Sequence, residues 1–260
     1  MTSVKSRSNR SPASTSASAA PALPADSVIA YMSSMKACFF DLDGTLADSR
    51  AGLYSSLRAA CEHLGIDPPS DDELTRFLGT PLPLVFRSYR PDLTDAEIEA
   101  GMQAFRAVYE KTGIRDNELY PGVVDMLAAA QRRGTKAWIV TSKPEPQAIR
   151  VAGLLEIDRL VEGVIGAGLA ETDTKTDLVR RALAAAGVAA DGVVMVGDRH
   201  YDVIGALENG VRPVGALWGF GTYDELHRAG CRHFVQSPDE FRKLFIETNR
   251  GFDRVTVAAE

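Results

Sequence analysis

The run Phe-Phe-Asp-Leu-Asp-Gly-Thr-Leu, from Phe39 to Leu46, constrains this chain more than any other stretch of its sequence. A short apolar run that ends at charged residues and a glycine predicts a buried parallel strand that opens into a loop. In open α/β sheets, ligands bind in the crevice beyond the carboxyl ends of the strands. The run therefore predicts that Asp41 and Asp43 lie at such a crevice.

Two carboxylates in this position suit chemistry at phosphorus. Asp41 can attack phosphorus and form an aspartyl-phosphate, as the aspartate of ATPases does. Asp43 can then transfer protons for the leaving group and the water. Paired aspartates beside a glycine also occur in surface turns, so the rest of the chain has to decide. A calcium-binding EF-hand loop is excluded, because its glycine stands sixth after a helix, whereas Gly44 stands fourth after a strand.

The bulk properties exclude several classes of partner. The chain has 260 residues and a net charge of −6, so it lacks the basic footprint of a protein that binds nucleic acid polymers. No segment approaches the roughly 20 apolar residues of a membrane span. Its three cysteines are far apart and form no C-x-x-C pair, which is typical of free thiols in a reducing compartment. We therefore expect a cytoplasmic protein, monomeric or homodimeric, that acts on a small molecule.

Both ends of the chain differ from its middle. Residues 1–34 are rich in serine, alanine and proline, and such a segment buries too little apolar surface to offset its ordering entropy. We expect residues 1–34 to form a disordered tail and residues 251–260 a flexible one. A transit peptide is the alternative interpretation of the first tail, and Met35 is a candidate start of the folded protein.

Residues 50–118 predict an inserted helical unit. Apolar residues between Leu53 and Leu64 recur at spacings of three and four, which is typical of an amphipathic helix. Thr94 and Glu97 form the capping-box pattern at the start of a long helix. The block contains no convincing strand, so we expect a unit built only of helices.

From residue 119 onward, predicted strands alternate with predicted helices. Such alternation predicts a parallel sheet that helices cover on both faces. We therefore expect an α/β fold in which residues 35–49 and 119–250 form one core and residues 50–118 interrupt it. The first strand is expected at 36–41, and the later strands are expected at 136–141, 161–166, 193–198 and 213–217, with residues 233–235 between the last two helices.

Polar residues beyond these strands suit a bound phosphate. Thr141 and Ser142 follow an apolar run, and their hydroxyl and N–H groups would hold phosphate oxygens. Lys175 opens a predicted helix and would neutralise the nucleophile and the phosphate. Lys143 is a rival for this role, but its neighbour Pro144 predicts the start of a helix that points away. We therefore favour Lys175.

A magnesium site is expected at the same edge. The pattern Gly-Asp-x-x-x-Asp after the strand at 193–198 places Asp198 at the strand tip and Asp202 nearby. Mg²⁺ takes a few oxygen ligands and keeps several waters. Asp41, the backbone carbonyl of Asp43, and Asp198 would suffice, with Asp202 close by.

With these residues in place, the chain resembles the haloacid dehalogenase superfamily, specifically its phosphatases of the phosphoglycolate phosphatase and 5′-nucleotidase type. The resemblance runs from Lys36 to about Leu244. It implies a Rossmann-like core with a helical cap inserted after the first motif. In many relatives a proline follows the lysine that corresponds to Lys175, whereas this chain has Thr176 at that position. The residues that match the four motifs are Asp41 to Thr45, including the nucleophile Asp41 and the acid/base Asp43; Thr141; Lys175; and Asp198 with Asp202.

Two loops bear on the choice of substrate. The segment from Phe77 to Leu82 is similar to the Gly-x-Pro-Leu loop of nucleotidase-like members, so we expect Arg76, Gly79 and Thr80 to influence specificity. The aromatic and glycine loop at 218–221 is either a plain turn or an aromatic wall beside the cap.

The expected activity is Mg²⁺-dependent hydrolysis of a small phosphorylated metabolite, with a nucleoside 5′-monophosphate favoured. Phosphoglycolate or a sugar phosphate is the alternative substrate. Asp43 speaks against a haloacid dehalogenase, and Lys111 is the only lysine at 50–135, late in the insert, which speaks against a phosphonatase. A phosphomutase stays open. A binding protein without activity is disfavoured, because both aspartates are present.

Overall fold

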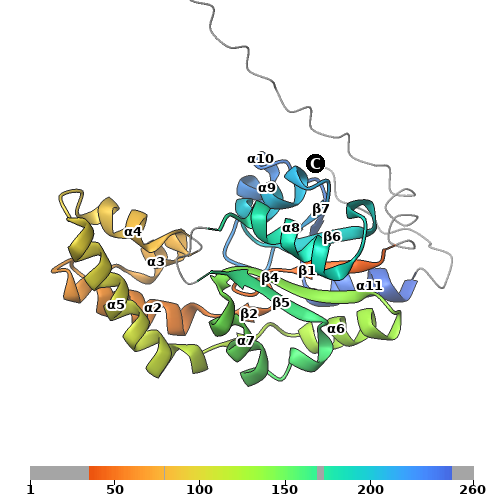
Figure 1. The fold of residues 1–260 in the computed structure, drawn as a ribbon, viewed down its shortest axis with the longest axis horizontal. Helices are drawn as coiled ribbons and strands as arrows, with labels where there is room; N and C mark the ends of the chain where they lie inside the picture. The colour runs from red at the N-terminus through yellow and green to blue at the C-terminus, as the bar shows by residue number, and fades with distance from the viewer. Residues whose placement is uncertain (1–34, 79, 169–172, 248–260) are drawn as a thin grey trace, which may run out of the picture.

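The structure is a computed structural model that describes residues 35–78, 80–168 and 173–247. It contains an α/β core and a smaller helical unit that projects from one side of the core (Figure 1). The predicted tails at 1–34 and 251–260 lie outside the described residues. None of the described helices is long and apolar enough to cross a membrane.

A six-stranded parallel sheet lies at the centre of the core, in the order β5-β4-β1-β6-β7-β8. From β1 the chain builds β4 and β5 on one side, then crosses to build β6, β7 and β8 on the other. The switch point of the topology therefore lies beside β1, where ligands of such sheets bind. The strands are β1 (Ala37–Phe40), β4 (Lys136–Pro144), β5 (Gly163–Ala167), β6 (Val193–Gly197), β7 (Arg212–Ala216) and β8 (Phe234–Val235).

Helices cover both faces of this sheet, which confirms the predicted α/β fold. The side chains of β1 alternate between two apolar clusters: Cys38 and Phe40 face one cluster, and Ala37 and Phe39 face the other. The first cluster is completed by α6 (Val123–Arg132), α7 (Glu145–Leu154) and α11 (Pro238–Glu247), and the second by α8 (Lys175–Ala186) and α9 (His200–Glu208); α10 (Tyr223–Arg228) packs on α9, and η2 (Asp158–Leu160) and η3 (Ala190–Gly192) are short 3-10 turns.

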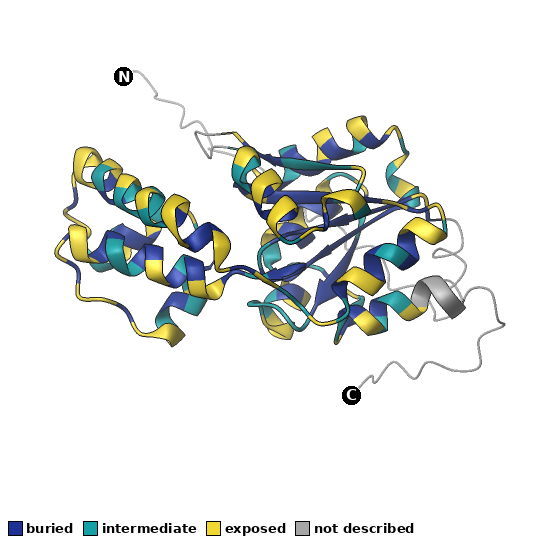
Figure 2. Ribbon diagram, turned by 90° about the horizontal axis from the view of Figure 1, so that it is seen from below, coloured by how far each residue is buried: buried dark blue, intermediate teal, exposed yellow. Residues whose placement is uncertain are grey.

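The insert folds into four helices around an apolar cluster of its own. Buried residues such as Leu57, Leu74 and Phe86 belong to this cluster, and the buried sides of the helices face one another (Figure 2). Capping boxes begin two of the helices, at Ser70 and at Thr94. We call this unit the cap. Its helices are α2 (Arg50–His63), α3 (Asp71–Phe77), α4 (Leu82–Tyr89) and α5 (Asp95–Lys111).

Two chain crossings join the cap to the core. The strands β2 (Ala47–Asp48) and β3 (Glu118–Leu119) pair antiparallel there, a pairing at the two ends of the insert that the sequence did not predict. Close by, Gly52 in α2 meets Gly113 in the short turn η1 (Gly113–Arg115). A Cβ atom at Gly52 would lie 2.1 Å from the carbonyl oxygen of Gly113. Only glycine permits this approach of the two backbones.

Candidate active site

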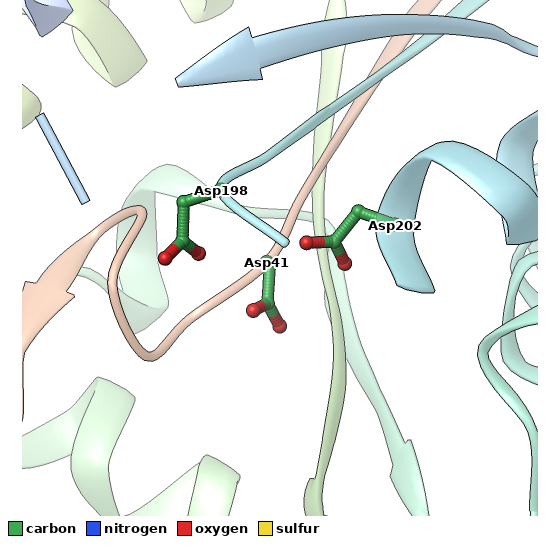
Figure 3. A group of neighbouring side chains, drawn as sticks. All are labelled: Asp41, Asp198 and Asp202. Atoms are coloured by element: carbon green, nitrogen blue, oxygen red, sulfur yellow. The ribbon is translucent and has the colours of Figure 1, made fainter. Parts of the chain in front are cut away.

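Three buried carboxylates converge beyond the carboxyl ends of two neighbouring strands. Asp41 follows β1, Asp198 follows β6, and Asp202 lies in the first turn of α9. Each offers an oxygen within 4.8 Å of the others, and Figure 3 shows the three side chains grouped together, with Asp202 directed toward Asp41. They meet because β1 and β6 pair in parallel, with Phe40 opposite Val196.

Two loops hold Asp198 in this cluster, the loop after β1 and the loop at 218–221. Thr45 donates its hydroxyl to Oδ1 of Asp198 at 3.1 Å, and the N–H of Phe220 donates to Oδ2 at 2.7 Å. Gly44 has a φ of +87°, and a Cβ atom there would lie 2.4 Å from Asp198 Oδ2. The glycine of the first motif therefore serves both a left-handed turn and the close approach of a carboxylate.

Lys175 joins two of the carboxylates from the start of α8. Its Nζ lies 2.9 Å from Asp41 Oδ1 and 2.8 Å from Asp202 Oδ1, and it donates to the carbonyl of Val140 at 3.1 Å. Burial lowers the pKa of Lys175, but the charges of Asp202 and Asp41 outweigh it and raise that pKa above its ordinary value. Lys175 therefore reaches the carboxylate of Asp41.

Lys143 also enters the site, which corrects the prediction that it points away. The strand β4 continues to Pro144, three residues beyond its predicted end. Since side chains alternate along a strand, Lys143 lies on the buried side with Thr141, whereas Ser142 is exposed. Its Nζ lies 2.7 Å from Asp43 Oδ2.

The cluster carries more negative than positive charge. Burial, partly offset by Lys175, raises the pKa of Asp41 to about 6. Burial and the charges of Asp202 and Asp41 raise the pKa of Asp198 well above its usual range. Three carboxylates against one ammonium suit a divalent cation, and carboxylate oxygens are the ligands that Mg²⁺ prefers. The side chain of Asp43 lies outside this group, so only its backbone carbonyl remains a candidate ligand.

The residues expected to bind phosphate and to set specificity make fewer contacts with the site than the carboxylates do. Thr141 is buried, and its hydroxyl accepts the N–H of Lys143 at 3.2 Å. Arg76 is exposed in the last turn of α3, and Thr80 begins the loop before α4. Within the described residues, no hydrogen bond or ion pair joins either residue to the carboxylates. Gly79 lies outside those residues.

Comparison with known proteins places this site in a family. The model of haloacid dehalogenase-like hydrolases matches residues 38–216. The chain belongs to this family. A 5′-nucleotidase from Pseudomonas aeruginosa is 36% identical over 207 residues, which are 79% of this chain and 93% of that protein. The tyrosine-protein kinase PtkA of Mycobacterium tuberculosis is 37% identical over 186 residues, which are 71% of this chain and 63% of that protein.

A solved structure supports the same assignment. The predicted phosphatase from Clostridium acetobutylicum matches with a TM-score of 0.76 and 30% identity, over 82% of this chain and 99% of that chain. The resemblance drawn from the four motifs is therefore confirmed at the level of the family and of the fold.

Among the described residues, aromatic side chains make two contacts between core and cap in this hydrolase, of which the sequence left the first open and missed the second. The loop at 218–221 is more than a plain turn, because Trp218 donates to the carbonyl of Thr45 at 2.9 Å and Phe220 packs against the apolar cluster of the cap. Tyr109 in α5 packs in the cluster of the core, beside Lys143. The aromatic and glycine pattern pointed to the first contact. No local pattern pointed to Tyr109.

Proposed function

We propose that this hydrolase is a Mg²⁺-dependent phosphomonoesterase that acts through an aspartyl-phosphate on Asp41. The observation that carries the proposal is the buried Asp41 carboxylate, paired with Lys175 and grouped with two further carboxylates at the switch point of the sheet. A carboxylate attacks an anionic phosphoryl group only where positive charge offsets the repulsion. Lys175 provides one such charge.

The reaction has two steps. First, Asp41 attacks phosphorus while the ester P–O bond breaks, and Asp43 gives a proton to the departing oxygen. Then a water attacks the phosphorus of the aspartyl-phosphate, Asp43 accepts the proton of that water, and inorganic phosphate leaves as Asp41 is restored. Lys175, with Thr141 and Ser142 at the end of β4, would bind the oxygens of the transferred group.

The cation would be held by Asp41, Asp198 and the backbone carbonyl of Asp43. When bound, it supplies positive charge to the phosphoryl oxygens as negative charge develops on them. Asp202, which shares Lys175 with Asp41, would keep that lysine in place. The excess of negative charge among the three buried carboxylates supports this assignment.

A nucleoside 5′-monophosphate is the favoured substrate. The likeness to the 5′-nucleotidase, which spans 93% of that protein, supports this choice. Arg76, Gly79 and Thr80 of the cap would contact the leaving group, while the core holds the phosphate. Phosphoglycolate or a sugar phosphate is the alternative.

Release of inorganic phosphate from a panel of esters tests the proposal. Nucleoside 5′-monophosphates, phosphoglycolate and sugar phosphates are each incubated with the protein, with Mg²⁺ and then with EDTA. We expect the highest kcat/KM with a nucleoside 5′-monophosphate. In the presence of EDTA we expect no release of phosphate from any ester. Absence of phosphate release from every ester would contradict the proposal, and transfer to a sugar or tyrosine hydroxyl would indicate a phosphotransferase instead.

A further inference from the structure

The two carboxylate oxygens of Asp43 have different surroundings. Oδ2 accepts a hydrogen bond from Lys143 Nζ at 2.7 Å. Oδ1 is buried and has no hydrogen-bond partner among the described residues. A buried oxygen without a partner costs about 1–3 kcal/mol, and more when it is charged, so Oδ1 is a candidate contact for a ligand. The structure leaves Oδ1 available to a substrate and commits Oδ2 to the protein.

Lys143 is itself held from several sides. Its side chain is 5% exposed, and its N–H donates to the hydroxyl of Thr141. The ammonium lies 4.8 Å from the centre of the ring of Tyr109, a distance at which the face of an aromatic ring attracts a cation.

The ring of Tyr109 comes from the cap. Tyr109 is 1% exposed in the last turns of α5 and stacks on Phe105 with ring centres 5.9 Å apart and an angle of 7°. Phe105 packs against the apolar clusters of both core and cap. A residue of the cap thus contacts the lysine that binds Asp43.

We propose that Lys143 is a positioning residue for Asp43, and that the ring of Tyr109 keeps Lys143 in place. The inference rests on the proposed phosphatase mechanism. Lys143 holds Oδ2 without transferring a proton to it. Because Oδ2 is held in this way, Oδ1 faces the bond that breaks. Oδ1 then delivers its proton to the leaving oxygen as the P–O bond breaks and the bond from Asp41 to phosphorus forms. Errors of about 1 Å in such a geometry cost about 100-fold in rate.

Dependence on the leaving group separates this role from a structural one. A p-nitrophenolate leaves without a proton, whereas the alkoxide of an alkyl phosphate needs one. We therefore measure kcat/KM, which reports the transfer to Asp41, over a series of aryl and alkyl phosphates. For Lys143→Met we expect a loss of about 100-fold on alkyl esters and only a few-fold on p-nitrophenyl phosphate.

Matched variants complete the test. Lys136→Met removes another lysine from the same strand, whose Nζ donates to the carbonyl of Ala186, and should leave the series unchanged. Lys143→Arg keeps the positive charge and should recover part of the loss. An equal loss across the series in Lys143→Met would overturn the proposal, because that is the signature of a merely structural residue.

The variant Asp43→Asn distinguishes a failure of this inference from a failure of the proposed phosphatase mechanism. It should show the same dependence on the leaving group, more strongly. If Asp43→Asn shows no such dependence, the acid role of Asp43 is wrong. If Asp43→Asn shows it and Lys143→Met does not, only the role of Lys143 is wrong.

The ring of Tyr109 gives a second, independent variant that leaves Lys143 in place. Tyr109→Leu should shift the series in the same direction by several-fold. Tyr89→Leu, at a cap tyrosine that pairs with Phe77, should not. If Tyr109→Leu instead loses the same factor of kcat/KM on every ester of the series, the role that we assign to the ring is wrong.

Discussion

The core of this hydrolase holds ion pairs in its interior, whereas the ion pairs described for its cap lie at the surface. In the core, Lys143 and Lys175 are at most 5% exposed and pair with buried or half-buried carboxylates. In the cap, arginines pair with acidic residues at the surface, where such pairs contribute about 0–1 kcal/mol. The burial of a charge costs several kcal/mol, so the core gives up stability to hold its charges, and this marks the core as the place of the chemistry. The surface pairs of the cap are Arg58–Asp71, Arg87–Asp95, Arg90–Asp92 and Arg106–Glu99.

One cap arginine departs from this pattern. Arg76 makes no ion pair with the described residues, whereas the other five arginines between residues 50 and 106 each do. It lies in the last turn of α3, just before the loop with Thr80. Arg76 is therefore a cap arginine that no described carboxylate pairs with, and we propose that it contacts an anionic substrate.

The largest expected effect comes from the nucleophile in the core. We expect Asp41→Asn to lower phosphate release by at least about 1,000-fold, because an amide does not attack phosphorus. The fold should persist, since the substitution removes a charge from a crowded cluster. Circular dichroism checks the fold, and a phosphate assay checks the activity. Near-normal release by this variant would contradict the covalent mechanism.

The second prediction concerns the divalent cation that we propose for the core. Mg²⁺ at about 100 times its Kd should raise the Tm by about 5–10 °C, because it binds only the folded protein. Asp198→Asn should abolish that shift, whereas Asp224→Asn, an exposed acid in α10, should keep it. Thermal unfolding with and without EDTA provides the measurement. An equal shift in Asp198→Asn would place the ion elsewhere.

The third prediction concerns the junction between the two regions. Gly52→Ala should destabilise the protein by about 1–3 kcal/mol, because the new Cβ would overlap the carbonyl of Gly113. Gly153→Ala, in a helix with open space around it, should keep or raise the Tm. Urea unfolding of the two variants gives the comparison. If both behave alike, the close contact at Gly52 is dispensable.

The smallest effect is expected in the cap. Arg76→Ala or Thr80→Val should change the ranking of natural esters by several-fold and leave p-nitrophenyl phosphate almost unchanged, because in the proposed mechanism the core alone binds the phosphate. Arg58→Ala, which breaks a surface pair of the same cap, serves as the control. A uniform loss on all esters would mean that the cap acts structurally and does not select substrates.

The sequence by itself determined the elements and the convergence of the site. Strand β6 is a continuous apolar run, and α5 begins at the capping box that Thr94 and Glu97 predict. The meeting of Asp41 with Asp198 followed from the same reasoning, because the carboxyl ends of parallel strands share one edge of the sheet. The start of α8 at Lys175 was also predicted. All of these depend on patterns that lie within a few residues of one another.

Only the tertiary structure decided which groups meet across the chain. Lys143 and Asp43 are 100 positions apart, and their contact depends on how far β4 continues beyond Thr141. The contacts of Tyr109 with Lys143 and of Gly52 with Gly113 depend on how the cap sits on the core. A local pattern fixes the direction of a side chain relative to its own strand or helix. What that side chain touches is set by the packing of elements that are distant in sequence, and only the folded chain contains that information.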